Sequence, residues 1–300
     1  QRSKTIYRFV KGQIASSKLT GIKSFKDFDS NDILSYRLPF IVIENLTTTD
    51  NLRDFYYLIN KKGVHLNTSE VYKAEYFDKL FLKLAEEVLD YQNLIELNLF
   101  TEVSIKRMND RAYVEELLGY LKLGIKEKKK VVENIYKDDI SQNEYEELRK
   151  KFFGIIDRIA ILNAIKPLRN TRYKQKNDFF TLFSFINENF GASQELLKYQ
   201  YQILLILDRA DEDGRQFIRP TNEDCDALKD YATNCVSQSN STNARERRLL
   251  FFNSVLKNTD INKNDILIDV VNFLSDVYGE DKIQFTKVDE YNLINVSLLD

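Results

Sequence analysis

The amino-acid sequence predicts an α+β protein that is predominantly α-helical. Nine glycines and three prolines in 300 residues are too few for the many turns of an all-β sandwich or barrel. Charged residues make up 30% of the chain, a share that suits long helices with one face in solvent. Apolar residues recur at helical spacing through most of the chain. We therefore expect an α/β region over residues 1–75 and an α-helical domain over residues 76–300.

The size and charge of the chain limit the classes of function. A chain of 300 residues forms one large or two smaller domains and buries roughly three quarters of its unfolded surface. A net charge of -2 provides no global electrostatic attraction to DNA. The sequence holds no run of eighteen apolar residues, and its first residues lack the pattern of a signal peptide. We expect a cytoplasmic protein without a membrane partner.

The elements of the first region follow from local signals. Residues 40–44 favour a strand, and residues 52–59 carry apolar side chains at helical spacing. Gly63 stands where a helix needs a positive φ to end. Asn67 then suits an N-cap, and Glu70 three residues later completes a capping box. From this cap we predict one amphipathic helix over residues 67–91, with Phe81 buried.

The rest of the chain shows a series of apolar stripes. We predict further helices over residues 114–125 with Asn109 or Asp110 as N-cap, 148–159, 179–186 ended by Gly191, 195–208, 223–236, 244–256 and 265–277. The helix over 195–208 is apolar nearly all round and should be central. Two polar segments, 211–214 and 237–243, are predicted loops. Alternation after residue 283 predicts a short β-hairpin around Asp289 and Glu290.

The segment that ends in the capping box also resembles a known family. It carries Ile59-Asn60, Gly63, Leu66 and Glu70 at the spacing of the F-x-R-I-N-x-x-G-x-x-L-x-x-x-E segment of GmrSD-type restriction and anti-phage defence proteins, with Leu58 at the usual arginine. That family has a ParB-like domain with a D-G-Q-Q-R motif, whose end resembles Gln1-Arg2. Residues 3–12 resemble the helix after the motif, and residues 36–44 resemble the next strand. The resemblance spans roughly residues 1–125.

The resemblance implies that this chain is one part of a larger machine. Residues 1–75 would be the carboxy-terminal part of a ParB-like nucleotide-binding domain, with the Asp-Gly of the motif upstream of Gln1. We expect the protein to sense nucleotide and/or modified foreign DNA and to control a nuclease located elsewhere. Its partners would be DNA, the upstream half of the ParB-like domain and a nuclease domain or subunit, and the protein could form an oligomer. The alternative is a non-catalytic helical interaction, adaptor or inhibitor module.

The family resemblance also implies a nucleotide site. Arg2 would be its catalytic residue, because a guanidinium offers a planar fork of donors to phosphate oxygens. The site would bind a nucleoside triphosphate with Mg²⁺ through Gln1, Arg2, Lys4, Thr5, Asn60 and Gly63. The glycine-closed turn leaves backbone N–H groups to face a phosphate. The alternatives are a solvated terminal arginine and an ordinary helix end. Without the upstream half, we expect no hydrolysis by these 300 residues alone.

Basic clusters are the candidate DNA contacts. The most concentrated one comprises Lys166, Arg169, Arg172, Lys174 and Lys176. Turn-forming and aromatic residues are interleaved with it in a predicted loop, as in segments that contact phosphates. Two other clusters surround residues 126–130 and 245–248. The alternative for each cluster is a solvated helix face.

Histidine and cysteine residues give little support to a metal site. Cys225 and Cys235 lie ten residues apart without a C-x-x-C pattern, and His65 is the single histidine. We interpret the two cysteines as reduced, partly buried thiols and His65 as a turn residue.

Overall fold

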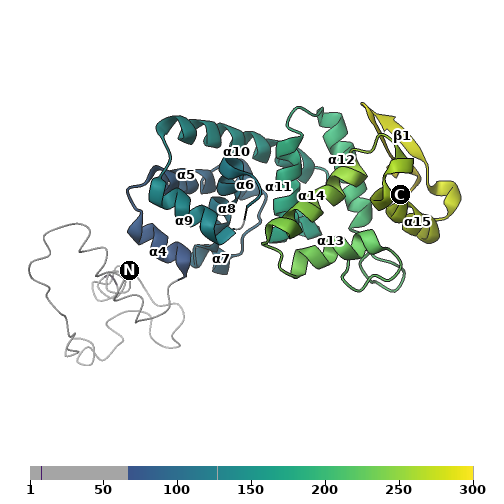
Figure 1. Ribbon diagram of the computed structural model, residues 1–300, viewed down its shortest axis with the longest axis horizontal. Helices are drawn as coiled ribbons and strands as arrows, with labels where there is room; N and C mark the ends of the chain where they lie inside the picture. The colour runs from purple at the N-terminus through teal and green to yellow at the C-terminus, as the bar shows by residue number, and fades with distance from the viewer. Residues whose placement is uncertain (1–7, 9–66, 127, 300) are drawn as a thin grey trace, which may run out of the picture. The chain divides into compact units, whose positions relative to one another are not determined.

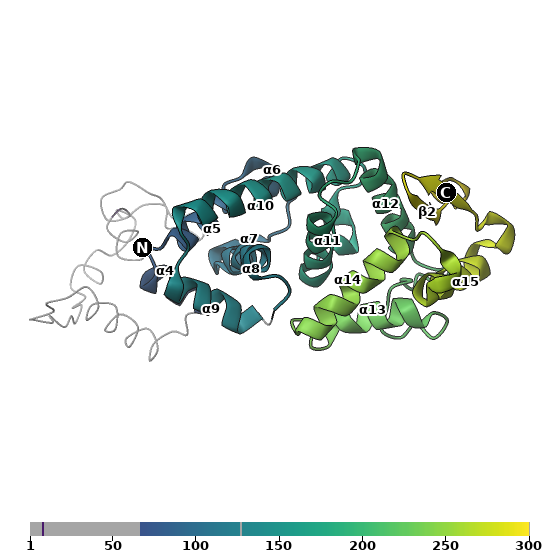
Figure 2. The same cartoon turned by 45° about the horizontal axis from the view of Figure 1, so that its top comes forward.

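The computed structural model describes residue 8, residues 67–126 and residues 128–299 (Figures 1 and 2). The chain divides into two compact units, residues 1–54 and residues 55–300. The described elements of the second unit are α-helices and one two-stranded antiparallel sheet, which confirms the predominantly helical α+β class. The strand and helix expected over 40–44 and 52–59, and His65, lie outside the described residues.

The helices and strands of the second unit follow in sequence order. The first half contains α4 (Thr68–Glu75), α5 (Leu80–Leu89), α6 (Gln92–Glu96), α7 (Glu102–Lys106), α8 (Asn109–Leu123), α9 (Lys128–Asp138) and α10 (Gln142–Asn163). The second half contains the short 3-10 helices η2 (Leu168–Asn170) and η3 (Arg172–Lys174), then α11 (Lys176–Glu188), α12 (Gln194–Leu207), α13 (Asp226–Val236), α14 (Thr242–Leu256), η4 (Ile261–Lys263), α15 (Asp265–Tyr278), η5 (Glu280–Lys282), β1 (Phe285–Val288), β2 (Tyr291–Ile294) and η6 (Val296–Leu298).

Helix α4 begins with the expected capping box. The Asn67 side chain accepts from the Glu70 backbone N–H at 2.9 Å, and the Glu70 carboxylate accepts from the Asn67 N–H at 2.8 Å. The single helix expected over 67–91 is wrong, because α4 ends at residue 75 and α5 starts at Leu80. The reason is a distant cap: the backbone N–H groups of Leu80 and Phe81 both donate to the Asp139 carboxylate at 3.0 Å.

Most other predicted helices are confirmed with shifted ends. Helix α8 begins at Asn109 behind Met108, whose backbone is left-handed at φ 54°, so the expected cap at Asn109 or Asp110 is wrong. Helix α11 ends at Glu188, ahead of Gly191. Helix α12 is buried along most of its length, as its all-round apolar sequence predicted. The terminal hairpin forms with Val288 opposite Tyr291, and Asp289 in the turn adopts φ 50°.

The long helix α10 connects the two halves of the second unit. It lies along α5 and also contacts α6, α8, α11 and α12 (Figure 1). Phe152, Ile155, Ile156 and Ile159 on this helix are fully buried. Burying a side chain of this kind contributes about 1.5–3 kcal/mol to the free energy of folding. Helices α13 and α14 pack side by side, and α14 also packs on α11, which brings the loop between α13 and α14 toward α8.

Candidate functional site

The expected nucleotide site lies outside the described residues. This applies to Gln1, Arg2, Lys4, Thr5, Asn60 and Gly63. The described part of the resembling segment begins at Asn67.

The structure separates the five expected DNA contacts into two groups. Lys166, Arg169 and Lys174 are exposed in the segment between α10 and α11. Arg172 instead points inward and has only 12% of its side chain exposed. Its Nε donates to the Asp178 carboxylate at 2.8 Å, and its Nη1 donates to the Ile218 carbonyl at 2.9 Å. These contacts occupy the guanidinium in the protein interior, so we correct the assignment of Arg172 from a DNA contact to a structural residue.

Lys176 also has a partner within the protein. Its ammonium lies 3.3 Å from the buried Glu116 carboxylate and 4.9 Å from the centre of the Tyr113 ring. Glu116 forms a second ion pair with Arg245, whose guanidinium lies over the Phe180 ring. Lys176 therefore helps to neutralise a buried carboxylate, although almost half of its side chain remains exposed.

Two arginines of the third basic cluster are buried and shape the loop between α13 and α14. Arg248 is fully buried and donates to the carbonyls of Asn234 at 2.5 Å and Ser239 at 2.9 Å. Its Nε donates to the Thr181 hydroxyl on α11 at 3.1 Å. Arg245 joins the same helix to Glu116 on α8. Together they fix residues 237–241, which belong to the polar loop that the sequence predicts, relative to α8 and α11.

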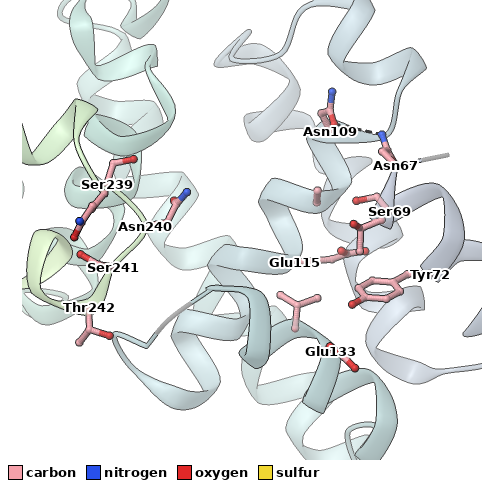
Figure 3. Close-up of a pocket in the computed structure, with 14 residues that line it drawn as sticks. Asn67, Ser69, Tyr72, Asn109, Glu115, Glu133, Ser239, Asn240, Ser241 and Thr242 are labelled. Carbon is pink, nitrogen blue, oxygen red and sulfur yellow. Dashed lines mark hydrogen bonds between the residues drawn. The ribbon is translucent and has the colours of Figure 1, made fainter. Parts of the chain in front are cut away.

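This loop forms one wall of a cleft with a volume of about 1080 Å³ (Figure 3), which we call the polar cleft because most of its lining residues have polar side chains. Gln238, Ser239, Asn240, Ser241 and Thr242 line that wall. The facing wall comes from α4, α8 and α9 and includes Asn67, Thr68, Ser69, Tyr72, Asn109, Ala112, Glu115, Val132 and Glu133. Figure 3 shows the two groups of side chains on opposite sides of the opening. The sequence indicates Asn67 as a helix cap and residues 237–243 as a polar loop, but it carries no signal that the two face each other.

Three helices begin at the walls of this cleft. Asn67 caps α4, and its amide nitrogen also donates to the Arg107 carbonyl and, at 3.4 Å, to Asn109 Oδ1 at the start of α8. Across the cleft, Ser241 caps α14 by accepting from the Ala244 N–H at 3.2 Å. Helix starts carry a partial positive charge and backbone donors. The walls therefore combine three helix starts with amide and hydroxyl side chains.

Unusual backbone conformations also occur at the cleft. Among the described residues, the non-glycine residues with left-handed φ are Asn98, Met108, Asp139, Gln238 and Asp289. Asparagine and aspartate tolerate this conformation, whereas methionine and glutamine rarely adopt it. Gln238 lines the cleft, and Met108 directly precedes the lining residue Asn109. Gln238 therefore holds a rarely adopted backbone conformation in the cleft wall.

The side chains at the α8–α9 wall are acidic and aromatic. Glu115 is buried, and its Oε1 accepts from the Tyr136 hydroxyl at 2.6 Å and lies 3.2 Å from Arg111 Nε. Burial, with the charges of Glu133, Glu75 and Glu115, raises the pKa of Tyr72 to about 12. Tyr72 therefore keeps its O–H donor at neutral pH. The described lining contains no lysine, arginine or histidine.

Neither cysteine takes part in the cleft. Both thiols are free and buried, which confirms their interpretation as unpaired thiols. Burial raises the pKa of Cys225 and of Cys235 to about 12. Within residues 67–126 and 128–299, no three His, Cys, Asp or Glu side chains are grouped as a metal site would require. None of the helices that the structure describes is both long and apolar enough to cross a bilayer.

Comparisons of this chain with protein-family models, curated proteins and solved structures found no match.

Proposed function

We propose that this chain is a sensing part of a restriction-type defence protein, which recognises nucleotide and/or modified foreign DNA and controls a nuclease located elsewhere. The observation that carries the proposal is the polar cleft. The segment that resembles the GmrSD-type family ends at Glu70, and its last residues supply Asn67, Thr68 and Ser69 to the cleft wall. The segment with the family's spacing therefore ends in the wall of a cleft that is large enough for a small-molecule ligand.

The chemistry of the lining supports recognition of the uncharged part of a nucleotide. A volume of about 1080 Å³ lies just above the usual range of about 300–1,000 Å³ for small-molecule sites. Amides, hydroxyls and helix-start N–H groups can pair with the donors and acceptors of a base or sugar. Phosphate would face Glu115 and Glu133 without a neighbouring cation in the described lining. We therefore place the base or sugar in the cleft and the phosphate at its mouth.

The described unit recognises its ligand in this proposal and does not hydrolyse it. Glu115 is held by Arg111 and Tyr136, so it is poorly placed to accept a proton from a water molecule. Hydrolysis of a nucleoside triphosphate with Mg²⁺ is proposed only for Gln1, Arg2, Lys4, Thr5, Asn60 and Gly63, as the family resemblance implies.

Isothermal titration calorimetry tests the cleft. The 300-residue chain is titrated with nucleosides, nucleoside triphosphates and short duplexes with and without modified bases. Ala112→Leu places bulk in the cleft while keeping a good helix former in α8, and Ala164→Leu adds the same bulk at an exposed position at the end of α10. We expect binding to be lost in Ala112→Leu and retained in Ala164→Leu. Equal binding by both variants would exclude the cleft, and no binding by the unmodified chain would favour the adaptor interpretation.

A further inference from the structure

An apolar groove with a volume of about 690 Å³ lies on the first half of the second unit. Its apolar lining comprises Leu89, Leu94, Ile95, Leu99, Phe100, Ile105 and Met108. Ile95 and Ile105 are 54% and 53% exposed. Ile105 belongs to α7, a helix in which no residue is buried and in which Val103 is 69% exposed. Apolar side chains gathered in this way on a surface mark a protein interaction site.

The charges around the groove determine which partner fits it. Its two cations are already paired, since Lys73 lies 2.8 Å from Glu86 and Arg111 lies 3.2 Å from Glu115. Two aspartates, Asp90 and Asp110, also line the groove. No ion pair to either aspartate occurs among residues 67–126 and 128–299.

The C-terminal end of α5 adds negative potential to the groove. Asp90 is the C-cap residue of α5, where the helix dipole already places negative charge, and the last turn of α5 contains no basic residue. A carboxylate at that position is destabilised until a cation approaches it. Asp110 lies in the first turn of α8 and is only 8% exposed, so its carboxylate is in the floor of the groove. The exposed Asp90 therefore favours a basic partner.

We propose that this groove binds a basic amphipathic helix of a partner protein. Apolar residues at i, i+3, i+4 and i+7 of that helix would enter the groove between Ile95 and Ile105, and its lysine or arginine residues would face the exposed Asp90. This inference does not depend on a ligand in the polar cleft.

The test uses a labelled synthetic helix of about sixteen residues, with leucine at the four anchor positions and lysine at its exposed positions. Its fluorescence anisotropy is measured with the 300-residue chain at low and at physiological salt. We expect binding that weakens with salt and that weakens by about tenfold or more in Ile105→Glu and in Ile95→Glu. Leu250→Glu changes an equally exposed residue on α14 and should bind like the unmodified chain. Circular dichroism establishes that each variant is folded.

A second peptide, with glutamate in place of lysine, isolates the charge argument. It should not bind, because its carboxylates would face Asp90. Absence of binding by the lysine peptide at low salt, equal binding by Ile105→Glu, or equal binding of the glutamate peptide would each overturn the proposal.

Two further measurements distinguish other occupants of the groove. A maleimide should react with Ile105→Cys as fast as with Leu250→Cys, because the two positions are equally exposed. The native thiols are buried and should not compete for the reagent. Slow reaction would show that another part of this chain already covers the groove and would overturn the proposal. Sedimentation should give the same mass for the unmodified chain and for Ile105→Glu. A dimer that Ile105→Glu abolishes would identify a second copy as the occupant and would also overturn it.

Discussion

Buried charged residues connect segments of this protein that are distant in sequence. Arg245 and Arg248 belong to a basic cluster that the sequence suggested as a solvated face or a DNA contact. Both are buried, because they share the inner face of α14 with Phe252 and Val255. Arg245, Arg248 and Phe252 stand at i, i+3 and i+7, so the helical spacing places all three on one face and indicated that both arginines are buried. Their carboxylate and carbonyl partners could not be predicted, since α8 and the loop before α14 meet α14 only in the folded chain.

At the start of the second unit, Phe81 and Asn67 should differ strongly in their effect on stability. Phe81 is fully buried, so Phe81→Ala leaves a cavity and should lower the free energy of unfolding by about 3 to 5 kcal/mol. Asn67→Ala removes a cap and should cost about 1 kcal/mol. Chemical denaturation measures both values. Similar small losses would show that Phe81 does not lie in the core.

The charge of Glu144 should make stability depend on acidic pH. A hydrogen bond from Lys122, with further bonds from Ser141, lowers the pKa of Glu144 to about 2. Its pKa in the unfolded chain is the ordinary 4.5, so the folded state favours the charged form. This contribution to stability is present above pH 4.5 and is lost as the pH falls toward 2.

Glu144→Gln tests this dependence. Glutamine can still complete the capping box with Ser141 but carries no charge. Denaturation is followed between about pH 2 and pH 6, the range in which carboxylates titrate. The stability of the unmodified chain should fall more steeply at acidic pH than that of the variant. Identical slopes would show that the ion pair with Lys122 does not contribute.

At the scale of elements, local periodicity predicted the helices but not their boundaries. Helices α10, α12 and α15 have continuous apolar stripes, and their positions followed from spacing alone. The break between α4 and α5 depends on Asp139, which lies far along the chain and caps α5 from the loop before α10. The cleft depends on the same kind of distant contact. Its residues were visible as a helix cap and a polar loop, but their juxtaposition required the packing of α14 on α11.

Substitutions at Asp139 test whether this distant cap separates α4 from α5. Asp139→Ala removes both acceptors at a left-handed backbone position and should cost about 1 to 2 kcal/mol or more. Asp139→Asn keeps one acceptor and tolerates φ 63°, so its loss should be smaller. Asp139→Gly removes the acceptors without the steric cost of a left-handed alanine and should lie between them. Hydrogen exchange should show faster opening of Leu80 and Phe81 in Asp139→Ala. An alanine variant as stable as the asparagine variant would contradict the capping role.

At the scale of the whole molecule, the net charge of the chain and its local clusters of charge make different predictions about DNA binding. The chain carries a net charge of -2, yet Lys166, Arg169 and Lys174 are exposed together between α10 and α11. Contact with duplex DNA remains a proposal for these three residues. Arg172 is not a suitable residue for testing it, because removing its guanidinium would leave Asp178 buried without its ion-pair partner.

The salt dependence of DNA affinity distinguishes a true contact from a solvated loop. If the segment lies against the duplex backbone, Arg169→Ala with Lys174→Ala should reduce the slope of log affinity against log salt by up to about 1.8, since each phosphate contact contributes about 0.9. Lys150→Ala with Lys151→Ala removes the same charge from the exposed surface of α10 and is the matched control. Fluorescence anisotropy of a labelled duplex over a range of salt concentrations measures the slope. If both double variants change the slope equally, binding reflects overall charge alone, and these residues form a solvated loop.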